Sequence, residues 1–198
     1  MLKICIIVDH PTRDLPGNII LANKLIEEKN RVFLIPSKYI EECLLIKPDL
    51  VIANYARPVY ENFFKALNSK GIDICVIDTE GAPFGKNNSH YQYYPLTIFK
   101  YIKYIKYYFL WGKDQYNLAY KYCQKLKSNN FSKLKVTGSP MFDYHKILKQ
   151  KKNQKTLKKK IILINTGLSI ANPRFSSGYE NEVDNIIKEA NVKKKIAL

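Results

Sequence analysis

The chain has 198 residues and a mass of 23.1 kDa, enough for one substantial hydrophobic core but short for a complete two-lobed enzyme. Hydrophobic residues make up 46% and charged residues 25%, which excludes a disordered or collagen-like chain. No apolar run approaches the ~20 residues that span a bilayer, and the first residues lack the pattern of a secretory signal. We therefore expect a cytoplasmic protein.

The net charge of +16 arises from 33 Lys and Arg against 17 Asp and Glu. Such an excess suits a nucleic-acid binder or a protein at an anionic membrane surface. Much of the excess, however, lies at 146–160, which carries eight lysines and no acidic residue. No RNP-like, zinc-finger or helix-turn-helix pattern accompanies it, so nucleic acid is the weakest partner class. We interpret this stretch as an exposed basic connection that could contact anionic lipids at the inner face of the plasma membrane.

Several kinds of site are excluded by missing motifs. Four cysteines are spread singly through apolar segments and three histidines lie far apart, which predicts reduced core cysteines and no metal site. The turn after the first strand lacks GxGxxG, and GxxxxGK[ST], GxSxG and HExxH are absent from the chain. We therefore expect no metal and no bound cofactor.

Short β-rich runs alternate with helical stretches along the chain. Strands are predicted at 3–9, 31–36, 49–54, 72–78, 107–112 and 133–138, and helices at 18–29, 37–47, 57–71, 97–106, 114–128 and 141–150. Asn18 is expected to cap the first helix and Gly71 to end the third. The polar residues 79–96 are predicted to form a long functional loop, and a new strand and helix follow at 160–167 and 179–190.

This alternation predicts an α/β fold with a doubly wound, mostly parallel, Rossmann-like sheet. We assign the Rossmann-like lobe to 1–145, a basic linker to 146–159 and the incomplete start of a second lobe to 160–198.

Polar residues and glycines follow the carboxyl ends of the strands, which share one edge of a parallel sheet. In chain order they are Asp9, Arg13, Asp14, Asn54, Arg57, Glu80, Gly81, Gly138, Ser139, Thr166 and Ser169. In the strand order 3-2-1-4-5-6, strands one and four are neighbours, so Asp9 and Glu80 would face one crevice with Arg13 nearby. Carboxylates and arginines together suit general-base activation of a hydroxyl group and binding of an anionic substrate. Singly, each of these residues is as readily a helix cap or a loop residue, and Trp111 is expected in the core.

Five segments carry a family resemblance: DHPTRDLPGNIILANKL, VIDTEG, FLWG, VTGSPMFD and ILINTGLSIANPRF. Together they resemble the surface carbohydrate biosynthesis proteins, a bacterial family related to capsule and polymer glycosyltransferases of the glycosyltransferase-B fold. The resemblance runs from residue 3 to about residue 176. VTGSPMFD also resembles the GxPxxD stretch of CDP-glycerol polymer transferases and sugar-nucleotide epimerases. Members usually carry arginine where this chain has Met141.

The resemblance implies the N-terminal, acceptor-side lobe of a glycosyltransferase in surface polysaccharide biosynthesis, of capsule or O-antigen type. In such an enzyme we expect Glu80 as the general base, with Asp9 as second choice. Arg13 and Arg57 would bind acidic sugar or phosphate groups, and Thr166 and Ser169 would approach a nucleotide-sugar donor.

Members have two lobes and roughly twice this length, so the resemblance implies that the isolated chain is inactive and that a separately encoded second lobe is a candidate partner. The expected ligands are a nucleotide sugar and a glycan or lipid-linked acceptor. The alternative interpretation is a non-catalytic binding or scaffold remnant of a polysaccharide assembly complex.

Overall fold

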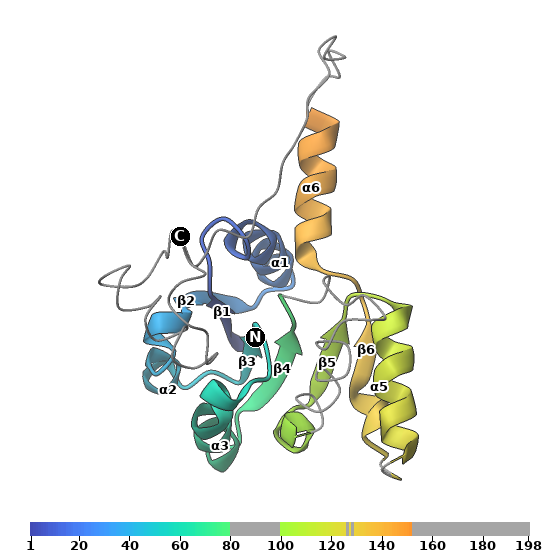
Figure 1. Ribbon diagram of the computed structural model, residues 1–198. Coiled ribbons are helices and arrows are strands. Elements are labelled where there is room, and N and C mark those ends of the chain that lie inside the picture. The colour runs from blue at the N-terminus through green and yellow to red at the C-terminus, as the bar shows by residue number, and fades with distance from the viewer. Residues whose placement is uncertain (80–99, 126, 128, 152–198) are drawn as a thin grey trace, which may run out of the picture. The chain divides into compact units, whose positions relative to one another are not determined.

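A six-stranded, all-parallel β-sheet forms the centre of the computed structural model, with helices packed on both of its faces (Figure 1). The structure describes residues 1–79, 100–125, 127 and 129–151, all within one compact unit, Met1–Asn153. The described part is the predicted Rossmann-like α/β lobe. The predicted loop beyond residue 79 and the predicted second lobe lie outside the described residues.

The strands are β1 (Lys3–Val8), β2 (Arg31–Pro36), β3 (Leu50–Ala53), β4 (Asp73–Ile77), β5 (Tyr107–Leu110) and β6 (Leu134–Val136). The helices are α1 (Leu15–Glu27), α2 (Glu42–Ile46), α3 (Glu61–Ser69), α5 (Lys113–Lys125) and α6 (Pro140–Lys151). Short 3₁₀ helices lie at Ser37–Tyr39, Pro58–Tyr60, Ile102–Tyr104 and Asn129–Lys133. Each of the six strands predicted up to residue 138 is confirmed, with ends that differ by up to two residues.

The strand order is β2-β1-β3-β4-β5-β6, which corrects the expected order 3-2-1-4-5-6. β1 lies between β2 and β3, and β4 pairs with β3 and β5, so strands one and four are not neighbours. Burial gives the reason, because Val51, Ile52 and Ala53 of β3 are buried on both faces as in an internal strand, whereas β2 is partly exposed as at an edge. The topological switch point is therefore between β1 and β3.

The first helix begins earlier than predicted. It starts at Leu15, and Asp14 takes the N-cap position that was expected for Asn18. Pro16 explains the shift, since its fixed φ angle suits the first turn of a helix and its missing N–H costs nothing there. Asn18 therefore lies inside the helix and is buried. Gly71 follows α3 with a φ of +69°, as its predicted role at the helix end requires.

The two faces of the sheet carry separate hydrophobic clusters. The larger cluster packs α2, α3 and α5 against one face, through residues such as Phe64 and Tyr108, and the smaller cluster packs α1 against the other. The four cysteines are buried in these clusters, as predicted. Burial raises the pKa of the Cys75 and Cys123 thiols, so neither is a ready thiolate.

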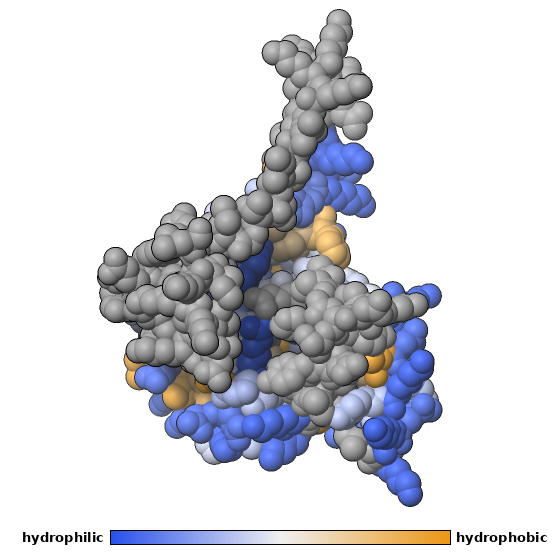
Figure 2. All heavy atoms as spheres, viewed as in Figure 1, coloured by the Kyte–Doolittle hydropathy of each residue, from blue (hydrophilic) through white to orange (hydrophobic). Residues whose placement is uncertain are grey.

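Helix α6 extends the chain away from the sheet and contacts α1 (Figure 1). Residues 146–151, at the start of the predicted linker, form its second half, and the lysines at 146 and 149 are exposed. Figure 2 shows hydrophilic residues over this half of α6 and over α5, with apolar residues where α6 leaves the sheet. The rest of the linker lies outside the described residues.

Candidate functional site

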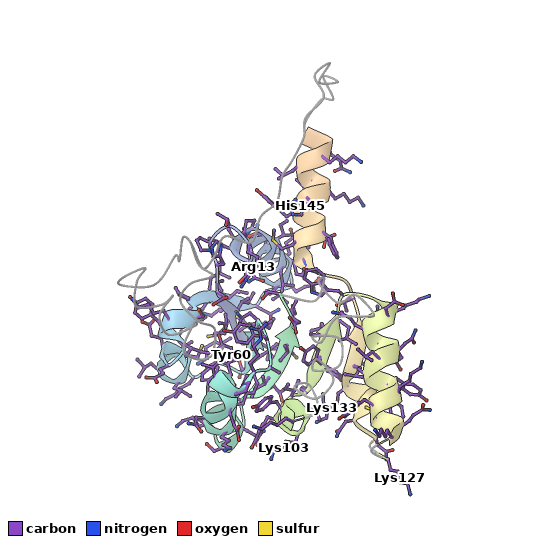
Figure 3. The ribbon with its side chains drawn as sticks, viewed as in Figure 1. Arg13, Tyr60, Lys103, Lys127, Lys133 and His145 are labelled. Atoms are coloured by element: carbon purple, nitrogen blue, oxygen red, sulfur yellow. The ribbon has the colours of Figure 1, made fainter. Side chains whose placement is uncertain are left out.

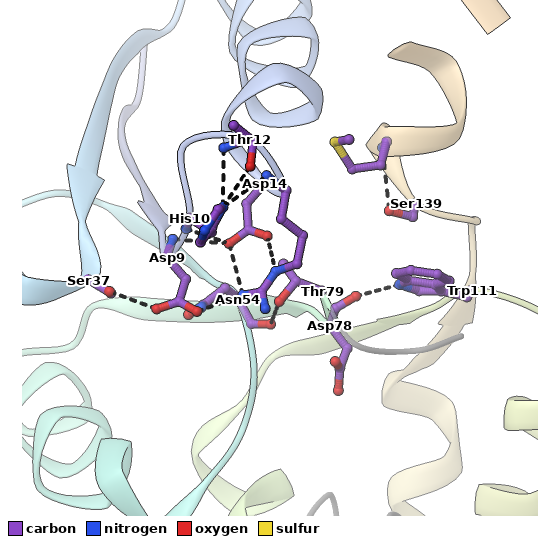
Figure 4. A network of polar contacts seen from close by, with 12 residues as sticks. Asp9, His10, Thr12, Asp14, Ser37, Asn54, Asp78, Thr79, Trp111 and Ser139 are labelled. Carbon is purple, nitrogen blue, oxygen red and sulfur yellow. Dashed lines mark hydrogen bonds and ion pairs between the residues drawn. The ribbon is translucent and has the colours of Figure 1, made fainter. Parts of the chain in front are cut away.

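The loop between β1 and α1 is held by a network of two carboxylates and one guanidinium (Figure 4). Arg13 donates from Nη2 to Asp9 Oδ2 at 2.6 Å and from Nε to Asp14 Oδ1 at 2.7 Å. The Oδ2 atom of Asp14, which is 2% exposed, also accepts the backbone N–H groups of Asp9 and His10, both at 3.1 Å. The hydrogen bond that Arg13 donates to Asp14 does most to raise the pKa of Arg13 above its ordinary value, so the guanidinium is a fixed cation.

Both carboxylate oxygens of Asp9 accept hydrogen bonds in this network. Its Oδ1 atom accepts the Ser37 hydroxyl at 2.9 Å, and its Oδ2 atom accepts Arg13. Ser37 follows β2, so the contact ties the ends of two neighbouring strands. This geometry suits a role in holding Arg13 better than a role in taking a proton from a substrate.

Asn54 lies at the end of β3, next to β1 at the switch point. Its Oδ1 atom accepts the Tyr60 hydroxyl at 3.0 Å, and its backbone carbonyl accepts the Thr79 N–H at 3.0 Å. Both Asn54 and Tyr60 are almost fully buried, and within the described residues the Asn54 Nδ2 atom has no hydrogen-bond partner. The Asn54 backbone carbonyl thus joins the end of β3 to the residue that follows Asp78, and the Asn54 side-chain amide makes one hydrogen bond within the described residues.

Replacing Tyr60 by phenylalanine is expected to destabilise the fold by about 1–3 kcal/mol, because the buried Asn54 carbonyl loses its donor. Burial raises the pKa of the Tyr60 hydroxyl. The folded state therefore favours the protonated form, and this contribution is complete below the unfolded-state pKa of about 10 and lost as the pH rises above it. Urea unfolding from pH 7 to 11 should show a smaller alkaline loss for Tyr60→Phe than for the wild type. The exposed Tyr39→Phe is the control, and an equal alkaline loss in all three proteins would contradict the prediction.

A cavity of about 310 Å³ lies beside this network, where the first turns of α1 and α6 meet. Its polar lining residues are Thr12, Arg13, Asp14, Asn18, Thr79 and Ser139. Apolar and aromatic residues also line it, namely Ile77, Trp111, Met141, Phe142, Tyr144 and His145, and we call the contacting rings of Trp111 and Phe142 the aromatic wall. Figure 3 shows Arg13 beside α1 and His145 on α6. The cavity therefore combines polar and aromatic side chains from four separate parts of the chain.

The aromatic wall is held in a defined orientation. The Trp111 indole N–H donates to the backbone carbonyl of Asp78, and the Trp111 ring meets Phe142 edge to face with 5.2 Å between ring centroids. The buried Asp78 carboxylate in turn accepts the Tyr108 hydroxyl at 2.7 Å. Trp111, which the sequence places in the core, is half-buried and presents part of its ring to the cavity.

Two buried polar groups face the cavity from the helices. Asn18 and Ser139 are each 7% exposed and line it from α1 and from the residue before α6. Within the described residues, Ser139 Oγ accepts one long hydrogen bond of 3.4 Å from the Met141 N–H, and its hydroxyl can donate to a further acceptor. The Asn18 side chain makes no hydrogen bond to the described part of the chain. Among the described residues, Asn54 Nδ2 alone is a fully buried side-chain nitrogen or oxygen without a partner, so the polar atoms of Asn18 reach solvent and can bind water or a ligand hydroxyl.

The predicted site residues fall into distinct groups. Asp9, Arg13 and Asp14 are brought together, and Ser139 joins Arg13 and Asp14 at the cavity. Gly138 lines a neighbouring apolar cavity with a φ of +85°. Asn54 and Arg57 line neither cavity. The Arg57 guanidinium carbon lies over the Tyr55 ring, 4.6 Å from the ring centroid.

Four predicted site residues cannot be placed, since Glu80, Gly81, Thr166 and Ser169 lie outside the described residues. Several other cavity residues were not predicted as site residues, among them Asn18, which was expected as a helix cap, Trp111, which was expected in the core, and His145. The spacing of Asp14 and Asn18 could have predicted that Asn18 lines the site. These residues are one helical turn apart and lie on the same face of a helix that starts at Leu15.

Within the described ranges, no group of three or more His, Cys, Asp or Glu side chains is placed to hold a metal ion. None of the described helices is both long and apolar enough to cross a membrane. Comparison with protein-family models finds no match to the chain, and comparison with curated proteins finds no significant one.

Proposed function

We propose that this chain is the acceptor-side lobe of a glycosyltransferase of surface polysaccharide biosynthesis, and that the cavity between α1 and α6 holds a sugar ring of the acceptor. One observation carries the proposal. Four of the five segments behind the family resemblance line this one cavity, through Arg13 and Asn18, Thr79, Trp111, and Ser139. The fifth segment lies outside the described residues.

The mixture of aromatic and polar lining residues suits a sugar. A pyranose ring has apolar C–H faces, which pack on aromatic rings, and hydroxyl groups at its edge, which need donors and acceptors. Trp111 supplies an oriented aromatic surface, and Asn18 and Ser139 supply polar groups with unused hydrogen bonds. The volume of about 310 Å³ is at the small end of ligand cavities, which suits one sugar ring better than a whole nucleotide sugar.

The general base of the proposed reaction is Glu80. Asp9 is bound to Arg13 and Ser37 and lines neither cavity, which supports a positioning role for it. Thr79 lines the cavity, and Glu80 is the next residue in the chain. A nucleotide-sugar donor, a lipid-linked acceptor and contact with anionic lipid remain the proposed partners of the whole enzyme.

The experiment uses Trp111, because it is the single tryptophan of the chain and lines the cavity. Titration with a panel of monosaccharides, alkyl glycosides and nucleotide sugars should give a saturable fluorescence change with at least one sugar. Asn18→Ala is expected to weaken that binding about fivefold to tenfold, the worth of about one hydrogen bond.

The matched control is Asn68→Ala, an exposed asparagine in α3, which should leave binding unchanged. Both variants replace asparagine by a better helix former, so neither is expected to unfold the protein. Absence of binding by every sugar in the panel would refute the proposed function, and equal weakening by both variants would refute the assignment of the cavity.

A further inference from the structure

The peptide unit that joins Asp78 to Thr79, which we call the 78–79 peptide unit, is held from both sides. Its carbonyl accepts the Trp111 indole N–H (Figure 4). Its N–H, which belongs to Thr79, donates to the Asn54 backbone carbonyl at 3.0 Å. These two partners follow the strands on either side of β4. Because both of its polar groups are bonded to neighbouring strand ends, the unit cannot rotate without breaking a hydrogen bond.

Trp111 is anchored through its side chain and through its backbone. Its indole N–H bonds to the 78–79 peptide unit, and its backbone N–H donates to Gln115 Oε1 at 2.7 Å. Gln115 is buried in the first turn of α5. The Trp111 ring also meets the Phe142 ring of α6 edge to face. Three contacts from separate elements therefore hold the ring that lines the cavity.

Thr79 contributes a hydroxyl group to the same cavity. Within the described residues, its Oγ1 atom donates one long hydrogen bond of 3.4 Å to the Asn54 carbonyl, and its lone pairs can accept a hydrogen bond from a ligand. Because Thr79 is part of the 78–79 peptide unit, the indole hydrogen bond of Trp111 sets where this hydroxyl lies relative to the Trp111 ring. An aromatic ring and a hydrogen-bonding group are thus joined as one unit.

We infer that Trp111 and Thr79 together determine which sugar the cavity selects, by recognising the configuration of one ring hydroxyl. This inference rests on the proposed function and specifies its sugar selectivity. A pyranose that packs its C–H face on the Trp111 ring directs each hydroxyl along the sugar ring or out of its plane, according to configuration. A Thr79 hydroxyl in a fixed position meets one of these directions, so an epimer leaves it without a partner. Trp111 is therefore also a positioning residue for Thr79, through its indole N–H.

The test compares methyl β-D-glucopyranoside with its epimers at C2, C3 and C4. Dissociation constants are measured by ligand-observed NMR, which works equally in a variant without tryptophan. The wild type should bind one of the four about fivefold to tenfold more tightly than the epimer with that hydroxyl inverted, the worth of about one hydrogen bond. Thr79→Val removes the hydroxyl at nearly constant shape and should bring this epimer ratio close to one.

Trp111→Phe separates the two roles of Trp111. It keeps an aromatic ring but removes the indole N–H, so it should weaken all four glycosides and also bring the epimer ratio close to one. The double variant with Thr79→Val should lose no further selectivity, because the two residues act as one unit. The chain has one tryptophan, so its indole N–H gives a single NMR signal, and slow exchange of that proton with solvent is expected in the wild type.

Tyr108→Phe is the matched control. The Tyr108 hydroxyl donates to the carboxylate of Asp78 at 2.7 Å, not to the 78–79 peptide unit. Its loss should therefore lower the stability of the fold and leave the epimer ratio as in the wild type. This readout distinguishes positioning of Thr79 from general support of the fold.

The outcomes also distinguish this inference from the proposed function. Equal binding of the four glycosides by the wild type, a wild-type ratio that persists in Trp111→Phe, or a ratio that is also lost in Tyr108→Phe would overturn the inference and leave sugar binding standing. Rapid exchange of the indole proton would overturn it as well. Failure of all four glycosides to bind would overturn it too, and would count against the proposed function only if every other sugar of the larger panel also failed to bind.

Discussion

Replacing Asp14 by alanine is expected to destabilise the folded protein by about 2–3 kcal/mol, because the Asp9 and His10 N–H groups and the Arg13 guanidinium lose a buried acceptor. The side chain of Asp14 is 1% exposed and is bound to Arg13, while the backbone N–H groups of Asp9 and His10 also donate to it. Without it, these two N–H groups and part of the guanidinium lose their acceptor. Urea denaturation followed by far-UV circular dichroism measures the change.

The matched control is Asp73→Ala. Asp73 accepts a hydrogen bond from Lys106 at 2.6 Å, nearly the same length as the Arg13–Asp14 contact, but both side chains are about half exposed. An exposed ion pair contributes about 1 kcal/mol or less, since water already solvates both charges. A loss for Asp14→Ala no larger than that for Asp73→Ala would show that the loop between β1 and α1 does not depend on the buried carboxylate.

Replacing Gly17 by valine is expected to cost about 2–3 kcal/mol of stability and to abolish the sugar binding that we propose for the cavity. A Cβ atom at Gly17 would lie 2.8 Å from the Met141 backbone nitrogen and 2.9 Å from the Pro140 carbonyl carbon. These are backbone atoms of the first turn of α6, so the clash is relieved only by moving one helix away from the other. Because Gly17 also lines the cavity, that movement changes the cavity itself.

Gly112→Val is the control for this variant. A Cβ atom at Gly112 would meet nothing within 4 Å, and the residue does not require a positive φ angle. Its loss of stability should be about 1 kcal/mol or less, the range for changing the residue that precedes a helix. Thermal unfolding and Trp111 fluorescence titration of both variants test the prediction, and retained sugar binding by Gly17→Val would contradict it.

Much of the fold could be predicted from local patterns. The continuous apolar runs of β1, β3 and β4 and the amphipathic stretches between strands indicated a parallel sheet with helices on both faces. Once the strands were parallel, the residues after each strand had to lie at the same edge, which brought Asp9, Arg13 and Asp14 near Ser139. These features depend on the spacing of nearby residues and on chain connectivity, so they can be predicted from the sequence alone.

The neighbours of each strand were decided by tertiary packing. The spacing of strands and helices along the sequence is compatible with both the observed strand order and the expected order 3-2-1-4-5-6. The burial of β3 on both faces places this strand inside the sheet. The same is true of the cavity. The sequence predicts Trp111 in the core, whereas in the structure its indole N–H donates to the Asp78 carbonyl. Nothing in the sequence distinguishes Gly17 from other glycines, but in the structure α6 packs directly against it.

By itself, then, the sequence determined the strands, their parallel direction and the edge at which polar residues gather. The tertiary structure alone decided the strand order, the close approach of α1 and α6, and the pairing of an aromatic wall with the Asn18 amide. The physical reason is that backbone conformation and hydrophobic periodicity are local properties. The walls of a cavity, in contrast, are contributed by residues far apart in the chain, and their positions follow from how whole elements pack.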